Sequence, residues 1–190
     1  SILPRLQRVV RQAARMTGKT VELTVAGEDT AVDARLLQSL IEPLGHLLRN
    51  AIDHGIESTE ERERSGKAAC GRVSVEFRRD GRRLHVRCSD DGRGLDLDAI
   101  RARAMETGLI GPEASTEPAA LARLILEAGF STRRQATQLS GRGIGMDVVQ
   151  RAVRDLRGGI ELAAVEGGGL EVRIEVPEGI VAIPAVVVRT

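Results

Sequence analysis

The chain has 190 residues, of which 28 are basic and 27 acidic, and its formal net charge at pH 7 is +1. This length suits one domain with a full hydrophobic core, and the balanced charge argues against a protein drawn to nucleic acid or anionic lipid. The two cysteines form neither a disulfide framework nor a metal motif, and we expect a cytoplasmic protein without a signal peptide or membrane span.

The first part of the chain alternates between helical and strand patterns. Residues 4–16 repeat apolar side chains at helical spacing, and Gly18 ends this helix. Residues 21–25 alternate apolar and polar side chains as a strand does, and residues 33–41 return to helical spacing. Farther on, residues 58–70 are charged and irregular, which predicts a surface connection.

A helix with polar groups on one side is predicted around the sequence HLLRNAIDHGIE at residues 46–57. Pro43 suits its first turn, where the missing N–H would have no partner, and Gly55 suits the position just past its last turn. Polar groups recur at i, i+4, i+7 and i+8 and should share one side: His46, Asn50, Asp53 and His54. Taken alone, this pattern also fits an amphipathic helix with a solvated polar face.

A β-hairpin follows at residues 72–79 and 82–90, joined by the turn signal Asp80-Gly81. Alternation of side chains predicts the inward residues Val73, Val75, Phe77, Leu84, Val86 and Cys88. The same alternation turns Asp90 into the core, where an isolated carboxylate costs several kcal/mol unless it meets a donor or borders a cavity. We therefore expect a donor or ligand at Asp90. The alternative is that the strand ends at Ser89 and Asp90 begins a turn.

Two glycine motifs come next, DDGRG at residues 90–94 and SGRGIGM at residues 140–146, and the second opens a helical pattern at residues 146–156. Closely spaced glycines at a helix start let backbone N–H groups approach phosphate oxygens. This signal is weak by itself. The motif lacks the lysine and hydroxyl residue of a P-loop, and no strand with a ribose-binding acid follows it.

The segment between the glycine motifs, residues 96–140, has the character of a lid. It contains helical patterns at residues 97–107 and 118–127. Residues 128–140 are mostly polar with Phe130 as the single aromatic, so they have few apolar groups to offset the entropy of ordering. We expect that part of the lid to be mobile without a ligand.

The motifs, taken in order, resemble the ATP-binding catalytic domain shared by histidine kinases, DNA gyrase B subunits, MutL-type repair proteins and the ninety-kilodalton heat-shock chaperone. Within this GHKL superfamily the chain is most similar to the CheA-type chemotaxis kinases. The similar stretches are residues 46–57, 90–94, 128–132 and 140–149, within a resemblance that runs from about residue 4 to 177. It implies an α+β fold, a two-layer sandwich with helices on one face of a mixed sheet. It also implies a catalytic domain at residues 1–177, with residues 178–190 leading toward a coupling module.

The resemblance further implies a site for ATP and Mg²⁺. Asn50 would coordinate Mg²⁺, with His46 beside it as a metal ligand or proton acceptor, and Asp90 would accept a hydrogen bond from the adenine amino group. Asp53 would either contact the nucleotide or only order its helix. The other residues implied at the nucleotide are Arg49, His54 and Arg133 near the phosphates, Gly92 and Gly94 near the base, Phe130 as a packing anchor of the lid, and Ser140, Gly141, Arg142, Gly143, Ile144, Gly145 and Met146 in the phosphate cradle. Arg133 stands where the family usually has lysine.

The implied function is transfer of the γ-phosphoryl group of ATP to a histidine on a separate phosphotransfer domain. A response regulator and coupling or receptor proteins would be partners through other domains of a homodimeric full-length protein, while the isolated domain would be a monomer. The alternatives are an ATPase and a non-catalytic nucleotide sensor. His46 stands where the hydrolases place a water-activating glutamate, which favours the kinase over the ATPase but does not separate kinase from sensor.

Overall fold

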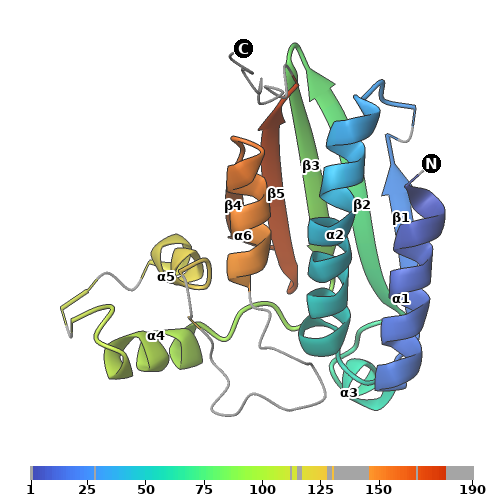
Figure 1. The fold of residues 1–190 in the computed structure, drawn as a ribbon. Coiled ribbons are helices and arrows are strands. Elements are labelled where there is room, and N and C mark those ends of the chain that lie inside the picture. The colour runs from blue at the N-terminus through green and yellow to red at the C-terminus, as the bar shows by residue number, and fades with distance from the viewer. Residues whose placement is uncertain are drawn as a thin grey trace, which may run out of the picture.

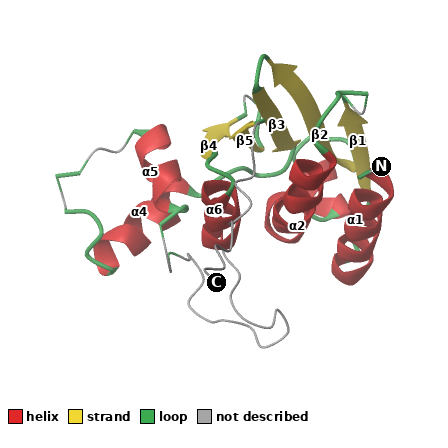
Figure 2. Cartoon of the chain, turned by 45° about the horizontal axis from the view of Figure 1, so that its top comes forward, coloured by secondary structure: helices red, strands yellow, loops and turns green. Residues whose placement is uncertain are grey.

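The computed structural model describes residues 2–27, 29–111, 113–114, 117–127, 130, 146–165 and 167–178. These residues form two layers, in which the helices α1 (Leu3–Thr17), α2 (Ala34–Asn50) and α6 (Met146–Asp155) lie side by side against one face of a sheet (Figure 1, Figure 2). The predicted two-layer α+β sandwich is confirmed. Within the described residues, no helix is long and apolar enough to span a bilayer.

The sheet has five strands in the order β1-β2-β3-β5-β4. β1 (Val21–Ala26) pairs parallel with β2 (Gly71–Asp80), and β2 pairs antiparallel with β3 (Arg83–Asp90). β5 (Leu170–Pro177) lies antiparallel between β3 and β4 (Gly159–Ala164). The sheet is therefore mixed, as predicted. β4 and β5 were not predicted, although residues 170–176 alternate in the manner of a strand.

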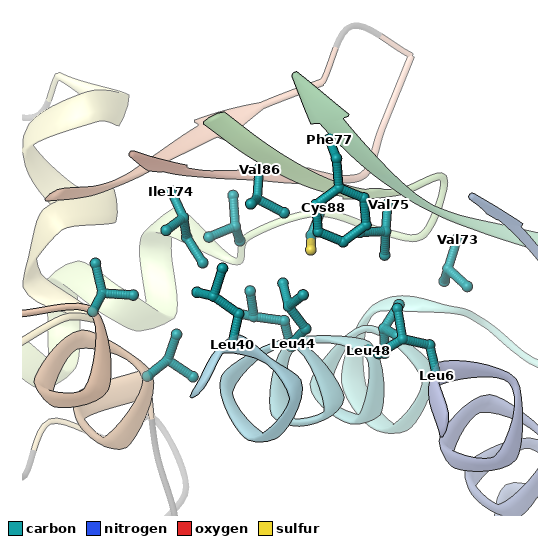
Figure 3. Packing of buried hydrophobic residues seen from close by; sticks show 14 of the residues in the cluster. Leu6, Leu40, Leu44, Leu48, Val73, Val75, Phe77, Val86, Cys88 and Ile174 are labelled. Carbon is teal, nitrogen blue, oxygen red and sulfur yellow. The ribbon is translucent and has the colours of Figure 1, made fainter. Parts of the chain in front are cut away.

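The predicted hairpin and its buried face are both correct. All six predicted inward residues are buried in the main core. Leu40, Leu44 and Leu48 of α2 point toward the sheet face that carries Val75, Phe77, Val86 and Cys88 (Figure 3). Asp90 is the last residue of β3 and is 8% exposed, so it continues the inward alternation and does not begin a solvent-exposed turn.

The prediction of two separate helices, one at residues 33–41 and one that begins near Pro43, is wrong. α2 runs unbroken from Ala34 to Asn50 with Pro43 in its interior, and Asp33 caps its first turn. A proline inside a helix costs roughly 3 kcal/mol, whereas full burial of one leucine contributes about 1.5–3 kcal/mol. The buried leucines on both sides of Pro43 therefore outweigh the lost hydrogen bond: Leu36, Leu40, Leu44, Leu47 and Leu48.

The prediction of an irregular connection at residues 58–70 is wrong, because this segment contains the helix α3 (Thr59–Arg64). Ser58 and Glu61 form a reciprocal capping box at its start, a signal that is readable in the sequence. Nor does the segment lie wholly at the surface. Arg62 is 1% exposed, and its charge is enclosed by the protein.

The helices α4 (Leu97–Glu106) and α5 (Pro118–Leu124) form the described part of the lid. They pack around a small core of their own, separate from the main one and made of Ile100, Ala104, Leu121 and Phe130. α5 ends three residues earlier than predicted. Residues 128–129 and 131–145, which include most of the segment expected to be mobile, lie outside the described residues.

Candidate functional site

Asn50 lies at the C-terminal end of α2, directly beside the start of α6. Its Nδ2 donates to Sδ of Met146, the first residue of α6, at 3.7 Å and across 96 positions of sequence. Sulfur is a weak acceptor, so this contact indicates proximity more than strength. The ends of α2 and α6 that meet here lie at the same end of the molecule (Figure 1). The helix motif and the last residue of the second glycine motif are therefore brought together, as the nucleotide-site hypothesis requires.

The chain after Asn50 forms a π-helical turn, η1 (Ala51–Gly55), and not a continued α-helix. The regular spacing expected from His46 to His54 therefore ends at Asn50, because a π-turn holds more residues per turn. His46, Asn50 and Asp53 are half-buried, whereas Arg49 and His54 are exposed. π-turns within helices are frequent at functional sites, which agrees with the location of this one.

Asp90 is the most strongly perturbed carboxyl group near this helix end. Burial raises its pKa to about 6, and the charges of Asp91 and Glu57 add to the rise, while backbone N–H groups of Gly92 and Leu170 oppose it. The Gly92 N–H donates to its Oδ1 at 2.9 Å. A buried carboxyl group that is ionised near neutral pH is a strong acceptor for a donor of a ligand.

Backbone from three segments packs closely around Asp90, and glycines make this possible. A Cβ at Gly55 would lie 3.1 Å from Asp90 Oδ1, so glycine at this position lets the two residues pack closely. Gly55 is the last residue of η1, whereas the sequence predicted it just past the end of the helix. A Cβ at Gly92 would lie 2.3 Å from the Gly55 carbonyl group, and one at Gly94 would lie 3.0 Å from Gly169 O. Packing within the protein thus already requires glycine at both predicted base-contact positions.

Gly169 belongs to a glycine triplet that was not singled out in the sequence. Its φ is +107°, and a Cβ there would lie 2.0 Å from the Asp90 carbonyl oxygen. Only glycine adopts this conformation without strain and leaves room for the approach. Three consecutive glycines at residues 167–169 were the available signal, but nothing in their spacing links them to Asp90.

A network of charged side chains lies beneath the turn that carries Asp90. Arg62 binds the Glu57 carboxylate at 3.1 Å and the Asp91 carboxylate at 2.8 Å, and Lys67 binds Glu57 at 2.7 Å. Although burial alone would raise the pKa of Glu57, the hydrogen bond and charge of Lys67, together with Arg62, hold it below its usual value. None of these four residues was predicted to form ion pairs; Arg62 and Lys67 lie in a run rich in Glu, Arg and Lys, which resembles a solvated surface.

The remaining predicted site residues fall into two groups. Phe130 is buried in the small core of the lid. The others lie outside the described residues: Arg133, Ser140, Gly141, Arg142, Gly143, Ile144 and Gly145. In the described part of the chain, no group of three His, Cys, Asp or Glu side chains could hold a metal ion. The Asn50 amide oxygen suits a hard cation whose other ligands are phosphate oxygens and waters, whereas the His46 imidazole suits Mg²⁺ poorly.

Comparisons with known proteins identify the family of this chain. Residues 37–180 match the family model described as histidine kinase-, DNA gyrase B-, and HSP90-like ATPase. The chain is 38% identical over 188 residues to the chemotaxis protein CheA of Salmonella typhimurium, covering 99% of this chain and 28% of that protein. It is 39% identical over 187 residues to the gliding motility regulatory protein of Myxococcus xanthus, covering 96% of this chain and 24% of that one.

The fold is similar to that of the mycobacterial sensor histidine kinase MprB, with a TM-score of 0.53, 18% identity, and coverage of 92% of this chain and 93% of that one. At this level of identity the likeness concerns the fold alone. The chain spans about a quarter of the length of the curated relatives named above.

Proposed function

Because this chain belongs to the family of histidine kinase-, DNA gyrase B- and HSP90-like ATPases, we propose that it binds Mg²⁺–ATP and transfers the γ-phosphoryl group to a histidine on a separate phosphotransfer domain. The observation that carries this proposal is the contact of Asn50 with Met146, which joins the His-x-x-x-Asn helix to the end of the glycine motif. Phosphoryl transfer depends on positioning and charge neutralisation more than on covalent help from the protein.

Asp90 recognises the base. Burial raises the pKa of its carboxyl group to about 6, so at neutral pH the carboxylate accepts a hydrogen bond from the adenine amino group. Guanine presents a carbonyl oxygen at that position, and two acceptors would then face each other in a desolvated pocket. Gly92 and Gly94 keep the neighbouring backbone close to Asp90.

Asn50 would hold the metal through its amide oxygen, and the phosphates would lie beside it. Bound Mg²⁺ would neutralise phosphate charge. His46, one helical turn earlier in α2, is the proton acceptor. Arg49 and His54 approach the phosphates from exposed positions. Asp53 either contacts the nucleotide or only orders this helix end. Met146 ends the phosphate cradle at residues 140–146, and Arg133 and Phe130 belong to the lid.

A kinase is favoured over an ATPase by the residue one helical turn before Asn50. Hydrolases of the resembled superfamily place a water-activating glutamate there, and this chain has His46. Glu42 lies two turns before Asn50 in the same unbroken helix, about 12 Å along its axis, and is exposed. Glu42 is therefore poorly placed to activate a water at Asn50.

The domain is part of a longer cytoplasmic, homodimeric signalling protein. Its direct partner is the phosphotransfer domain. A response regulator receives the phosphoryl group afterwards, and coupling and receptor proteins act through other domains. The names of the relatives, chemotaxis protein CheA among them, support the signalling role. Residues 1–177 form the catalytic domain, and residues 178–190 lead toward a coupling module.

The test is incubation of the domain with γ-labelled ATP and a histidine phosphotransfer domain from a CheA relative, with and without Mg²⁺. We expect acid-labile label on the acceptor only when Mg²⁺ is present. Release of labelled phosphate without transfer to the acceptor would favour the ATPase, and nucleotide binding without either reaction would favour the sensor.

A further inference from the structure

Arg62 is a buried cation, 1% exposed, and two of its contacts reach Asp91 in the turn after β3. Its guanidinium binds the Glu57 and Asp91 carboxylates, and it also donates to the carbonyl oxygens of Ala68 at 2.6 Å and Asp91 at 3.3 Å. The planar fork of arginine can serve several acceptors at fixed angles. Arg62 therefore ties α3, the end of η1 and the turn after β3 into one unit.

Lys67 adds a second cation to the same turn. Its amino group donates to the carbonyl oxygens of Asp91 at 3.0 Å and Gly92 at 2.8 Å, besides its ion pair with Glu57. The Lys67 amino group thus holds both of these carbonyl oxygens of the turn. On its other side, the Gly92 N–H donates to the Asp90 carboxylate.

The orientation of the Asp90 carboxylate depends on this turn. Asp91 also accepts from the Arg72 N–H at 2.8 Å, which anchors the turn to the start of β2. Glycine at residue 92 provides little conformational restraint of its own, since it has no side chain. The hydrogen bonds to its carbonyl and N–H groups therefore fix its conformation, and together with the Leu170 N–H they set the direction of the carboxylate.

We propose that Arg62 and Lys67 are positioning residues that set the base specificity of the nucleotide site by holding the Asp90–Gly92 turn. This inference rests on the proposed function, in which Asp90 accepts from adenine. The two cations do not touch the nucleotide. They act through the backbone that aims the Asp90 carboxylate, in the way that supporting hydrogen bonds hold a recognition group in its productive geometry.

Lys67→Met is the sharper variant, because Lys67 is partly exposed whereas removal of Arg62 would leave buried charges unpaired. The measurement is the affinity of the whole chain for ATP and for GTP by titration calorimetry. We expect ATP affinity to fall about tenfold, the effect of weakening one hydrogen bond, while GTP affinity stays the same. The ratio of ATP to GTP affinity therefore falls about tenfold. A lower fraction of folded protein would not change this ratio.

Lys67→Arg should restore most of the selectivity, because it keeps the charge and the donors. The matched control is Arg83→Met, which removes an ion pair with Glu175 at the opposite end of β3 from Asp90. We expect this control to leave both affinities unchanged. If Lys67→Met does not fold, Asp91→Asn is the second variant. It cuts the link to Arg62 at a partly exposed carboxylate and should lower the ratio in the same way.

Two failures can be told apart. Equal affinity of the wild-type chain for ATP and GTP would contradict the role of Asp90 in the proposed function itself. A wild-type preference for ATP that persists in Lys67→Met or Asp91→Asn would overturn the positioning role alone. An equal loss of affinity for both nucleotides would also overturn it, since it would assign the network to the fold and not to base selection.

Discussion

Lys19 donates its amino group to the main-chain carbonyl oxygen of Ile52 at 2.6 Å, across 33 positions of sequence, and to that of Asp53 at 3.1 Å. Both carbonyl groups belong to η1, where α-helical geometry ends and carbonyl oxygens lose their partners within the helix. A cation at this end of a helix is also favoured by the helix dipole. Lys19 therefore stabilises the turn that directly follows Asn50.

We predict that Lys19→Met destabilises the protein by about 1 kcal/mol, the typical value of one hydrogen bond, because two carbonyl groups lose their donor. Urea unfolding followed by circular dichroism measures this difference. Arg15→Met, on the exposed side of α1, is the control and should change stability by less than about 0.5 kcal/mol. Equal stability of wild type and Lys19→Met would show that water replaces the amino group at no cost.

The raised pKa of Asp90 predicts an unusual pH dependence of stability. An acid whose folded-state pKa is raised contributes stability that is present below its unfolded value of 3.8 and is lost as pH rises through about 6. At pH 7 the buried charge costs on the order of 2–3 kcal/mol. Asp90→Asn should therefore be more stable than the wild type at pH 7, and this advantage should vanish near pH 4. Urea midpoints at the two pH values test this. An advantage that is equal at both would contradict burial of the charge.

The same group predicts how nucleotide binding responds to pH. Only the ionised Asp90 carboxylate accepts freely from the adenine amino group, so ATP affinity should fall as pH drops below about 6. GTP affinity should be less affected, and Asp90→Asn should abolish the difference between the two nucleotides. Titrations between pH 5 and 8 would measure both trends. An ATP affinity that is constant over this range would remove Asp90 from the base site.

Asn50→Ala should abolish phosphotransfer while leaving the fold intact. Its one described side-chain hydrogen bond is the weak contact with Met146, so the loss of stability should stay below about 1 kcal/mol. The measurements are label transfer to the phosphotransfer domain and thermal unfolding. Ser39→Ala, at an exposed position of the same helix, is the control and should retain most of the activity. Normal transfer by Asn50→Ala would exclude the residue as a metal ligand.

Phe130→Ala should loosen the lid without unfolding the main core. Truncating a buried phenylalanine typically costs about 3–5 kcal/mol, and here the loss falls on the separate core of α4 and α5. We expect faster hydrogen exchange in these two helices and a larger decrease in phosphotransfer than in ATP affinity. Met105→Ala, at a position of α4 that is 41% exposed, is the control. Unchanged exchange in α4 and α5 would show that Phe130 does not hold the lid together.

The sequence by itself determined the features that depend on one segment at a time. Period-two alternation identified the β2–β3 hairpin and the inward direction of Asp90, because successive side chains of a strand point to opposite faces. Helical spacing likewise identified α1, α4 and α6. It failed at Pro43, where burial of leucines on both sides outweighs a local helix-breaking signal.

The tertiary structure alone decided which segments meet. Lys19 at η1, Gly169 against Asp90, and Arg62 between Glu57 and Asp91 each join residues whose spacing along the chain follows no period. Arg62 occurs in a charged run that favours a solvated surface, yet it is buried because three segments supply it with acceptors. A buried polar group is stable only when such partners surround it, and those partners exist only once the chain has folded.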